Sequence, residues 1–496
     1  MAADAGTTLN SVPAVRIRTV ADRPVRPERA FVLYWMIAHR RLGWNFALQR
    51  AVDLAVEHRR PLVILEPLRC GYRWASDRFH RFVLEGMAEH DARAERRGVT
   101  YYPYAEPTPG AGRGLLEALS PHAVAVVTDD YPEFFLPAMV AAAGRRLDLR
   151  LEAVDSNGLL PMRAADRAYP TAYAFRRFLQ KSLPVHFHEL PERDPLARVP
   201  RLASAALPDE VVRRWPRVDP AAFADLSGLV AALPIDHAVG PAAMRGGSAA
   251  GSRVLEDFLD RRLARYADDR NQPDVEAASG LSPWLHFGHV SPHEVFASLA
   301  ARENWSPLGI RERSDGSREG WWGMSRNAES FLDELVTWRE VGFNMASLRD
   351  DHDRYESLPD WAKRTLAEHA ADPREHLYSL DELDQARTHD ALWNAAQTQL
   401  VREGRMHNYL RMLWGKKVLE WSASPEDALA SLVELNNKYA VDGRDPNSYS
   451  GIFWVFGRYD RPWAPVRPIF GSIRYMSSAN TARKLRVREY LRTYTG

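Results

Sequence analysis

The order of the apolar segments restricts the fold of this chain more than any other feature of its sequence. Between residues 30 and 154, five apolar runs of strand length alternate with segments of helical periodicity. These runs are residues 30–38, 61–67, 99–106, 123–129 and 149–154. Apolar strands that alternate with helices are typical of a parallel sheet that helices cover on both faces. The sequence therefore predicts an N-terminal α/β domain with a doubly wound parallel sheet.

From residue 253 onward the pattern predicts helices only. Apolar residues recur at helical spacing in residues 253–269, 292–302, 330–347, 358–370, 386–403, 407–420, 425–438 and 481–492. A polar insert over residues 303–326 separates the second of these helices from the third. We therefore expect a flexible polar arm (1–28), the α/β domain (29–160), an interdomain connector (161–252) and a larger all-α domain (253–496).

The composition excludes several classes of protein. The single cysteine, Cys70, excludes a disulfide framework and a cysteine zinc site, and it fits a cytoplasmic location. No apolar run reaches about 18 residues, so no membrane-spanning helix is predicted. The glycines of residues 110–114 match neither a dinucleotide-binding motif nor a P-loop. Because no motif has the spacing of metal ligands either, we expect no bound metal.

The C-terminal segment is basic, although the whole chain carries 66 Lys and Arg against 65 Asp and Glu. Residues 461–496 contain eight basic residues and one acidic residue, Glu489, with aromatic side chains between the charges. Such a segment is typical of a surface that binds nucleic acid. A solvated, arginine-rich surface helix is an equally good interpretation of the charge pattern alone.

Two short segments carry residues that suit a ligand site. The string SGLSPWLHFG (279–288) places hydroxyl and small residues before a helix, where backbone N–H groups can hold a phosphate. An ordinary N-cap before a buried helix gives the same pattern. Glu334 and Trp338 are four residues apart on a predicted helix, so they share one face and can hold a nucleobase. The alternative is a surface Glu beside a core Trp.

Two further segments lie toward the C-terminus. Trp414 and Trp421 are seven residues apart, which places them on one helix face about 10.5 Å apart along its axis. Together with Trp393 of the preceding helix they form an electron relay, or simply part of the core. Residues 436–454 combine amides, carboxylates and an indole without strong helical periodicity. This pattern predicts a polar binding pocket or a polar loop between helices.

Taken in order, these segments resemble class II cyclobutane pyrimidine dimer photolyases of the photolyase/cryptochrome family. The matching strings are YADDRNQP (266–273), SGLSPWLHFG (279–288), WNAAQ (393–397), GRMHNYLRMLWGKKVLEW (404–421), DGRDPNSY (442–449) and FGSIRYMSS (470–478). The N-terminal domain resembles the antenna domain of the family, starting at FVLYWM (31–36). The resemblance thus implies an antenna-type α/β domain and an FAD-binding all-α domain.

The resemblance implies a set of FAD-binding residues. Those matching residues near the flavin phosphates are Tyr266, Ser279, Gly280, Leu281 and Ser282. Arg411 and Asp442 match a salt-bridged pair beside the flavin ring, and Asn436 matches an amide that faces flavin N5. Asp445, in the same string as Asp442, is also assigned to the cofactor. A second, antenna chromophore of the 8-hydroxydeazaflavin type is the remaining cofactor that the resemblance suggests.

The resemblance also assigns residues to the substrate and to electron transfer. The residues that match the lining of the dimer pocket are Glu334, Trp338, Met412 and Trp454. The residues that match groups at the DNA surface are Arg270, Arg461, Trp463 and Arg474. Trp414, Trp393 and Trp421 match an electron relay that leads from the flavin outward.

The implied activity is that of a deoxyribodipyrimidine photo-lyase, a carbon–carbon lyase. Excited, fully reduced FAD transfers an electron to a dimer flipped out of UV-damaged DNA, the cyclobutane ring splits, and the electron returns. We expect the protein to act as a monomer. The main competing function is that of a cryptochrome-like blue-light receptor without repair activity. Two further functions compatible with the sequence are repair of the 6-4 photoproduct and light-independent binding of nucleic acid by a flavoprotein.

Overall fold

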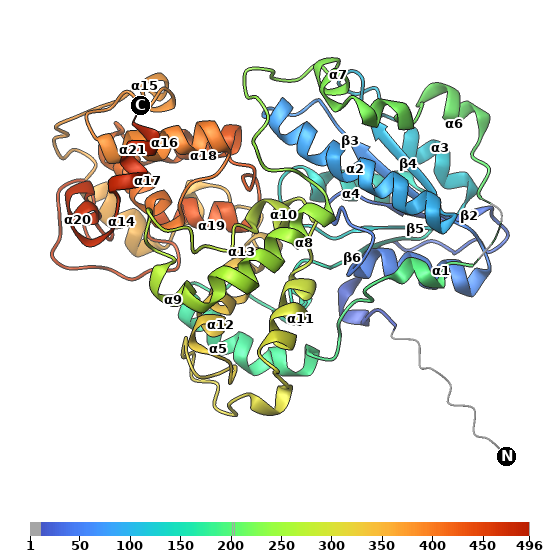
Figure 1. Ribbon diagram of the computed structural model, residues 1–496, viewed down its shortest axis with the longest axis horizontal. Coiled ribbons are helices and arrows are strands. Elements are labelled where there is room, and N and C mark those ends of the chain that lie inside the picture. The colour runs from blue at the N-terminus through green and yellow to red at the C-terminus, as the bar shows by residue number, and fades with distance from the viewer. Residues whose placement is uncertain (1–10, 201, 203, 496) are drawn as a thin grey trace.

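The computed structural model describes residues 11–200, 202 and 204–495. Its N-terminal part is a six-stranded sheet between layers of helices (Figure 1). The strands are β1 (Ile17–Ala21), β2 (Phe31–Trp35), β3 (Leu62–Leu68), β4 (Thr100–Ala105), β5 (Ala123–Asp129) and β6 (Leu151–Val154). They lie in the order β1-β6-β5-β2-β3-β4, and every neighbouring pair is parallel except β1 with β6. The predicted parallel sheet is thus confirmed for five of its strands.

Alternate side chains of the central strand β2 enter separate apolar cores on the two faces of the sheet. Val32 and Tyr34 belong to the core that contains α1 (Phe46–His58). The other three residues of β2 belong to the core that contains α3 (Leu115–Leu119) and α4 (Leu136–Arg146). Since successive side chains of a strand point to opposite faces, a strand covered on both sides is apolar throughout.

The expectation of a flexible arm over residues 1–28 is wrong for its second half. Residues 1–10 lie outside the described residues, but β1 pairs antiparallel with β6 at the edge of the sheet. Arg18 on β1 forms an ion pair with Asp130 at 2.6 Å. Of the five residues of β1, only Ala21 is buried. An exposed edge strand therefore carries no apolar run, and the sequence gives little signal for it.

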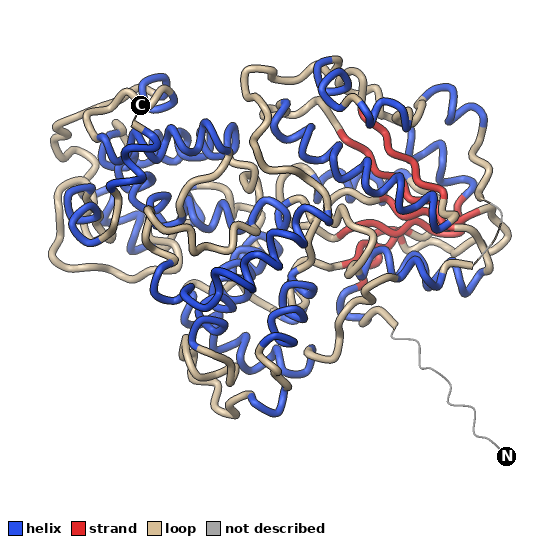
Figure 2. Tube along the Cα trace, in the orientation of Figure 1, coloured by secondary structure: helices blue, strands red, loops and turns tan. Residues whose placement is uncertain are grey.

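The C-terminal part consists of helices (Figure 2). Its main helices are α8 (Ser248–Asp257), α9 (Tyr266–Asp269), α10 (Ser282–His286), α11 (Pro292–Arg302), α12 (Arg326–Leu332), α13 (Arg339–Leu348), α14 (Asp360–Glu368), α15 (Leu380–Asp384), α16 (Ala391–Glu403), α17 (Asn408–Trp421), α18 (Pro425–Tyr439), α19 (Pro446–Val455), α20 (Ser478–Lys484) and α21 (Arg488–Tyr494). They surround two apolar cores. One contains residues of α14 to α19 and α21, and the other contains residues of α8 to α13 and of a helix over residues 172–182.

The helices differ from the sequence prediction at several places, of which three concern the candidate site and the basic C-terminal segment. The predicted helix over residues 330–347 is continuous, but Asp333–Trp338 form π-helical turns between α12 and α13. The predicted helix over 481–492 is two helices, α20 and α21. Residues 446–455 form α19, although their sequence lacks strong helical periodicity. This helix is buried on most of its surface, so its apolar residues follow no single stripe.

The region expected to be a connector, residues 161–252, is folded onto both parts of the molecule. Its first helix, α5 (Ala172–Ser182), lies with the C-terminal helices, whereas α6 (Asp209–Arg214) and α7 (Leu226–Ala231) lie against the sheet domain (Figure 1). Helix α7 contacts α2 (Asp77–Arg97), and α6 contacts α3. The chain therefore crosses between the two parts more than once before α8 begins.

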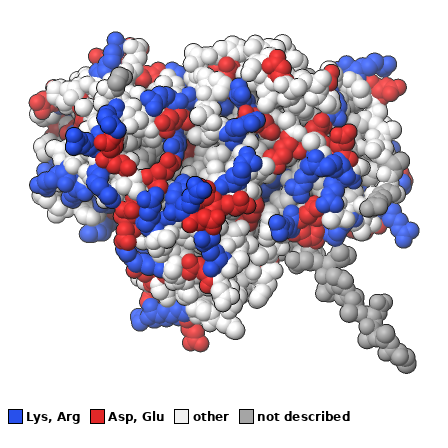
Figure 3. All heavy atoms as spheres, in the orientation of Figure 1, with Lys and Arg blue, Asp and Glu red and all other residues white. Residues whose placement is uncertain are grey.

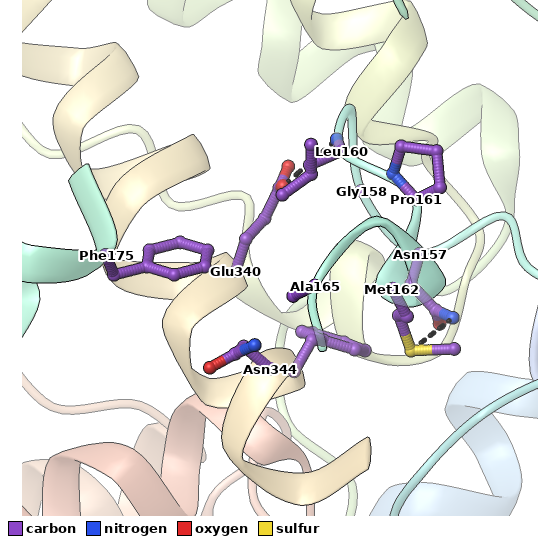
Figure 4. Close-up of a pocket in the computed structure, with 10 residues that line it drawn as sticks. Asn157, Gly158, Leu160, Pro161, Met162, Ala165, Phe175, Glu340 and Asn344 are labelled. Carbon is purple, nitrogen blue, oxygen red and sulfur yellow. Dashed lines mark hydrogen bonds between the residues drawn. The ribbon is translucent and has the colours of Figure 1, made fainter. Parts of the chain in front are cut away.

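A buried carboxylate holds the segment that follows β6 against α13. Glu340 on α13 accepts a hydrogen bond from the backbone N–H group of Leu159 at 2.7 Å. It accepts a second from the backbone N–H group of Leu160 at 3.1 Å (Figure 4). Burial raises the pKa of Glu340 to about 7. Beside these residues is a cavity of about 10 Å³, the space of roughly one water molecule. The contact fixes the start of α13, which directly follows the π-helical turns.

Candidate functional site

An ion pair joins α17 to the turn between α18 and α19. Arg411 Nη2 lies 3.1 Å from Asp442 Oδ1. Burial by itself would raise the pKa of Asp442, but Arg411 and a hydrogen bond with Ser282 hold it below its ordinary value. The structure therefore brings together three of the predicted cofactor residues, which come from three separate strings of the sequence.

Two adjacent amides and a helix cap form a buried network next to this pair. Asn436 Nδ2 donates to Ser448 Oγ at 2.7 Å, and Asn437 Nδ2 donates to Tyr449 OH at 3.1 Å. Asp445 caps α19, since its Oδ1 accepts from Ser448 N at 2.7 Å. These contacts fix the orientation of Asn436 and Asp445 without any bound molecule.

The structure leaves a polar atom without a partner in this region. His286 Nδ1, at the end of α10, is buried and makes no hydrogen bond within the described residues. It is 3.7 Å from Asp445 Oδ2, which is too long for a hydrogen bond. Burial lowers the pKa of His286, so this ring is neutral near pH 7. An unsatisfied buried nitrogen beside Asp442 and Asp445 fits a site that a polar ligand completes.

The predicted phosphate-binding turn precedes α10. Gly280 has φ +69°, a left-handed conformation that suits glycine, and Leu281 at the N-cap of α10 makes no side-chain capping hydrogen bond. Tyr266 is buried against Phe258 and Phe331, with ring centroids 5.5 and 5.6 Å away. Tyr266 and Leu281 belong to the same apolar core.

Glu334 and Trp338 lie on the π-helical turns rather than on a regular α-helix. Segments of π-helix are rare and occur frequently at functional sites. Glu334 forms an ion pair with Arg270, which follows α9. This pair was not expected, because the sequence assigned Glu334 to the dimer pocket and Arg270 to the DNA surface. One residue earlier, Asp333 forms a buried, bidentate ion pair with Arg176 of α5 at 2.7 and 3.1 Å.

The helices next to the predicted pocket residues pack on one another. Trp338 is partly buried at the edge of one helical core, and Met412 and Trp454 are partly buried at the edge of the other. Helix α13 begins directly after Trp338, and helix α17 carries Met412. Both helices pack on α19, which carries Trp454. At Gly342 of α13 a Cβ atom would lie 2.7 Å from a backbone oxygen of α19, so these helices approach closely.

Cations surround the indole of Trp454. Lys416 Nζ is 4.7 Å from the centre of its ring, and the guanidinium of Arg474 is 5.7 Å away. Arg474 is also 4.8 Å from the ring of Trp463, which Arg461 approaches to 4.7 Å. The predicted DNA-binding residues Arg461, Trp463 and Arg474 therefore form one row that ends at Trp454. Lys and Arg side chains also gather over α20 (Figure 3).

The three indoles of the predicted relay contact one another in a row. The rings of Trp393 and Trp414 are stacked with centroids 6.4 Å apart, and Trp421 meets the edge of Trp393 at 5.6 Å. Trp393 Nε1 donates to the backbone oxygen of Trp414 at 3.0 Å, and Trp414 Nε1 donates to Gln397 Oε1 at 2.9 Å. Trp393 thus lies between the other two indoles.

Sequence reasoning missed two residues beside the candidate site. Lys416 is fully buried, donates to the backbone oxygen of Val455 at 2.6 Å, and has its pKa lowered to about 7 by burial. Arg444 stacks on Phe79 of α2 at 3.7 Å and so ties the turn before α19 to the sheet domain. Both residues lie within recognised strings, but a string alone does not show which of its cations is buried.

Comparisons with known proteins decide the family. The deoxyribodipyrimidine photo-lyase of Methanothermobacter thermautotrophicus is 33% identical over 481 residues, a match that covers 97% of this chain and 98% of that protein. The chain belongs to the deoxyribodipyrimidine photo-lyase family. Family members from Potorous tridactylus and Arabidopsis thaliana are each 32% identical, with 96% and 95% of this chain covered and 84% and 89% of theirs. No family model matches the chain.

A solved structure also agrees with the photolyase fold. The bacterial class III photolyase from Agrobacterium tumefaciens superposes with a TM-score of 0.67 over 94% of this chain and 86% of that one, at 20% sequence identity. The described residues of this photolyase contain no group of three or more His, Cys, Asp or Glu that could hold a metal ion. Within the same residues, none of the helices is both long and apolar enough to cross a membrane.

Proposed function

We propose that this photolyase repairs cyclobutane pyrimidine dimers in DNA under blue light. The observation that carries the proposal is its similarity, over nearly its whole length, to proteins named deoxyribodipyrimidine photo-lyase. The packing of α13 and α17 on α19 supports it, because Trp338 directly precedes α13, α17 carries Met412 and α19 carries Trp454. The same residues speak against a light receptor that lacks repair activity.

The residues around Arg411 and Asp442 fit FAD. A partly buried ion pair, an oriented amide at Asn436 and an unpartnered His286 nitrogen form a polar site that a ligand with many polar atoms can complete. The turn of residues 279–282 and Tyr266 would hold its phosphates, and Asp445 would act through its contact with Ser448. Bound, reduced FAD supplies the electron that splits the dimer after light absorption.

The pocket residues have separate roles in this proposal. Trp338, Trp454 and Met412 provide apolar surfaces for a dimer flipped out of the duplex, since a flipped base is stacked against aromatic and apolar side chains. Glu334 accepts or shares hydrogen bonds at the polar edge of the dimer. Arg461 and Arg474 contact DNA phosphates, and Trp463 fills space next to the flipped nucleotides. Trp414, Trp393 and Trp421 conduct an electron inward when the flavin is photoreduced.

The oligomeric state, the location, the class of photolyase and the antenna chromophore are further parts of the proposal. We propose a monomeric, cytoplasmic enzyme whose finer class is class II, on the basis of the matching sequence strings. An antenna chromophore of the 8-hydroxydeazaflavin type stays a prediction. A cavity of about 360 Å³ lies between α18 and the loop of Arg73, but its border includes Asp353, Glu426 and Glu434. Three carboxylates against one arginine oppose the binding of an anionic chromophore there.

The proposal is tested by the flavin content and DNA preference of the purified protein. We expect noncovalent FAD that is released into the supernatant on heating, and tighter binding to a duplex with one dimer than to the same duplex without it. A folded, colourless protein without flavin would contradict the cofactor assignment. A flavin-loaded protein that binds both duplexes equally would contradict the dimer pocket.

A further inference from the structure

Two residues that the sequence assigned to different tasks are bound to each other in the structure. Arg270, at the predicted DNA surface, forms an ion pair with Glu334, in the predicted dimer pocket, across 64 positions of the sequence. Within the described residues, neither makes another ion pair. The guanidinium of Arg270 is also held 5.6 Å from the ring of Tyr266. This arrangement holds the guanidinium of Arg270 between Glu334 and the ring of Tyr266 rather than leaving it extended into solvent.

The pair is accessible enough for another partner to reach it. The side chains of Arg270 and Glu334 are 26% and 30% exposed, so water and ions reach both charges. The neighbouring pair of Arg176 and Asp333 is different, since these side chains are 5% and 10% exposed and the contact is bidentate. The buried pair of Arg176 and Asp333 therefore holds the π-helical turns in place, while the contact of Glu334 with Arg270 can open.

The other predicted DNA-binding arginines are not restrained in this way. Arg461 and Arg474 lie against the rings of Trp463 and Trp454, and within the described residues neither forms an ion pair with a carboxylate. They are available to DNA phosphates whether or not a lesion is present. Arg270 is available only when Glu334 releases it.

We propose that Glu334 is a lock on Arg270 which a dimer in the pocket opens. The inference rests on the proposed function. An undamaged duplex does not enter the pocket, so it leaves the pair closed and meets only the unrestrained arginines. A flipped dimer takes over the hydrogen bonding of Glu334, and Arg270 then exchanges its carboxylate partner for a DNA phosphate. Only noncovalent contacts are exchanged. Damaged DNA thereby gains one phosphate contact that undamaged DNA lacks.

The lock has a measurable consequence for salt dependence. Each phosphate that a protein neutralises on duplex DNA contributes roughly 0.9 to the slope of log affinity against log salt concentration. The wild-type protein should therefore show a slope that is steeper by about 0.9 for a duplex with one dimer than for the same duplex without it. A lesion pocket without the lock would change affinity but leave the slopes equal.

The experiment measures both duplexes in the dark with the FAD-loaded protein and three variants. In Glu334→Gln, free Arg270 should steepen the slope for undamaged DNA by about 0.9, which corresponds to about 8-fold tighter binding near 0.1 M salt. In Arg270→Gln, the slope for damaged DNA should fall to that for undamaged DNA. The double variant should lose the increase that Glu334→Gln produced. Circular dichroism and flavin content confirm that each variant is folded.

A matched control separates the lock from a simple change in net charge. Asp269 pairs with Arg486 at 2.9 Å on the surface nearby, and the side chain of Arg486 is 60% exposed. Asp269→Asn removes the same charge as Glu334→Gln and also frees one arginine, but it does not touch the pocket. It should affect both duplexes equally and preserve the difference between their slopes.

Three results would overturn the lock. The first is equal slopes for the wild type although damaged DNA is preferred, and the second is an unchanged undamaged slope in Glu334→Gln. The third is a loss of the slope difference in Asp269→Asn. If the wild type shows no preference for damaged DNA at all, the proposed function fails instead. In that case a steeper undamaged slope in Glu334→Gln, reversed by Arg270→Gln, would still support the restraint of Arg270.

Discussion

At the scale of single residues, Lys416 is the most unusual group near the candidate site. It is fully buried, its ammonium group lies over Trp454, and its hydrogen bond goes to the backbone oxygen at the end of α19. The partial negative charge at a helix C-terminus and the face of an indole both favour a cation, but neither replaces a carboxylate. The position of Trp454 therefore depends on a charge that is costly to bury.

The titration of Lys416 predicts how stability changes with pH. Burial lowers its pKa from 10.5 to about 7, so the unfolded chain binds this proton more tightly than the folded one. Stability should rise as pH increases from about 7 to about 10, by on the order of 5 kcal/mol at most from this group. Urea unfolding at both pH values, for the wild type and Lys416→Met, measures the effect. Relative to Lys416→Met, the wild type should gain free energy of unfolding as the pH rises. A difference in unfolding free energy that stays constant with pH would contradict the lowered pKa of Lys416.

The two indoles of the pocket predict a separate effect on DNA binding. Trp338→Ala and Trp454→Ala should each weaken binding to dimer-containing DNA by about 1–3 kcal/mol, the size of one base–aromatic stacking contact. Binding to undamaged DNA and flavin content should stay near those of the wild type. Titration of both duplexes in the dark checks this. Equal losses for damaged and undamaged DNA would mean that these indoles do not contact the lesion.

At the scale of elements, α16 and α17 hold the three indoles in a geometry that predicts separate paths for photoreduction and repair. Trp393 stacks on Trp414 and meets the edge of Trp421, so it is the link between the other two indoles. In Trp393→Phe the ring stays flat and apolar but is much harder to oxidise, and the smaller side chain costs only modest stability. We expect the variant to bind FAD, fail to photoreduce it with an external donor, and repair dimers after chemical reduction.

The matched control for this prediction is Trp361→Phe, on α14 outside the relay. Its photoreduction rate should equal that of the wild type. A wild-type rate in Trp393→Phe would exclude the relay. Loss of repair in the chemically reduced variant would show instead that Trp393 has a structural role.

The elements also show which parts of the fold the sequence could predict. Strand β5 and helix α11 lie at the predicted residues, because a buried strand and an amphipathic helix leave clear patterns in the sequence. Strand β1 was missed because a short edge strand is mostly exposed. Helix α19 was missed because it is buried on nearly all sides. The π-helical turns that carry Glu334 and Trp338 were missed because they add one residue per turn without changing the apolar pattern much.

The candidate site likewise contains contacts that the sequence predicted and contacts that it did not. Long matching strings predicted Arg411 with Asp442 and the order of the three relay indoles, and the structure has these contacts. The pairing of Arg270 with Glu334, the burial of Lys416 and the unpartnered nitrogen of His286 depend on how distant segments pack. No local pattern records such packing, so these features required the structure.

At the scale of the whole molecule, the two parts are joined through buried polar contacts rather than through one linker. Arg78 of α2 donates to the backbone oxygens of Val401, at 2.7 Å, and Tyr439, at 2.9 Å, in the helical part. Arg41 donates to the backbone oxygen of Gly288 at 2.9 Å. Together with Glu340, these contacts hold the helical site against the sheet domain. The candidate site is therefore presented on a scaffold whose two parts are fastened at several points.

The most direct test of the account is dimer repair under blue light, with a dark control. The FAD-loaded enzyme, chemically reduced, is mixed with a duplex that contains one cyclobutane dimer, and intact pyrimidines are measured by chromatography. We expect dimers to be converted under blue light and to remain in the dark, with conversion much reduced in Trp454→Ala at limiting enzyme. Unchanged dimers in the light, in a preparation shown to contain reduced flavin and to bind the damaged duplex, would contradict the central claim.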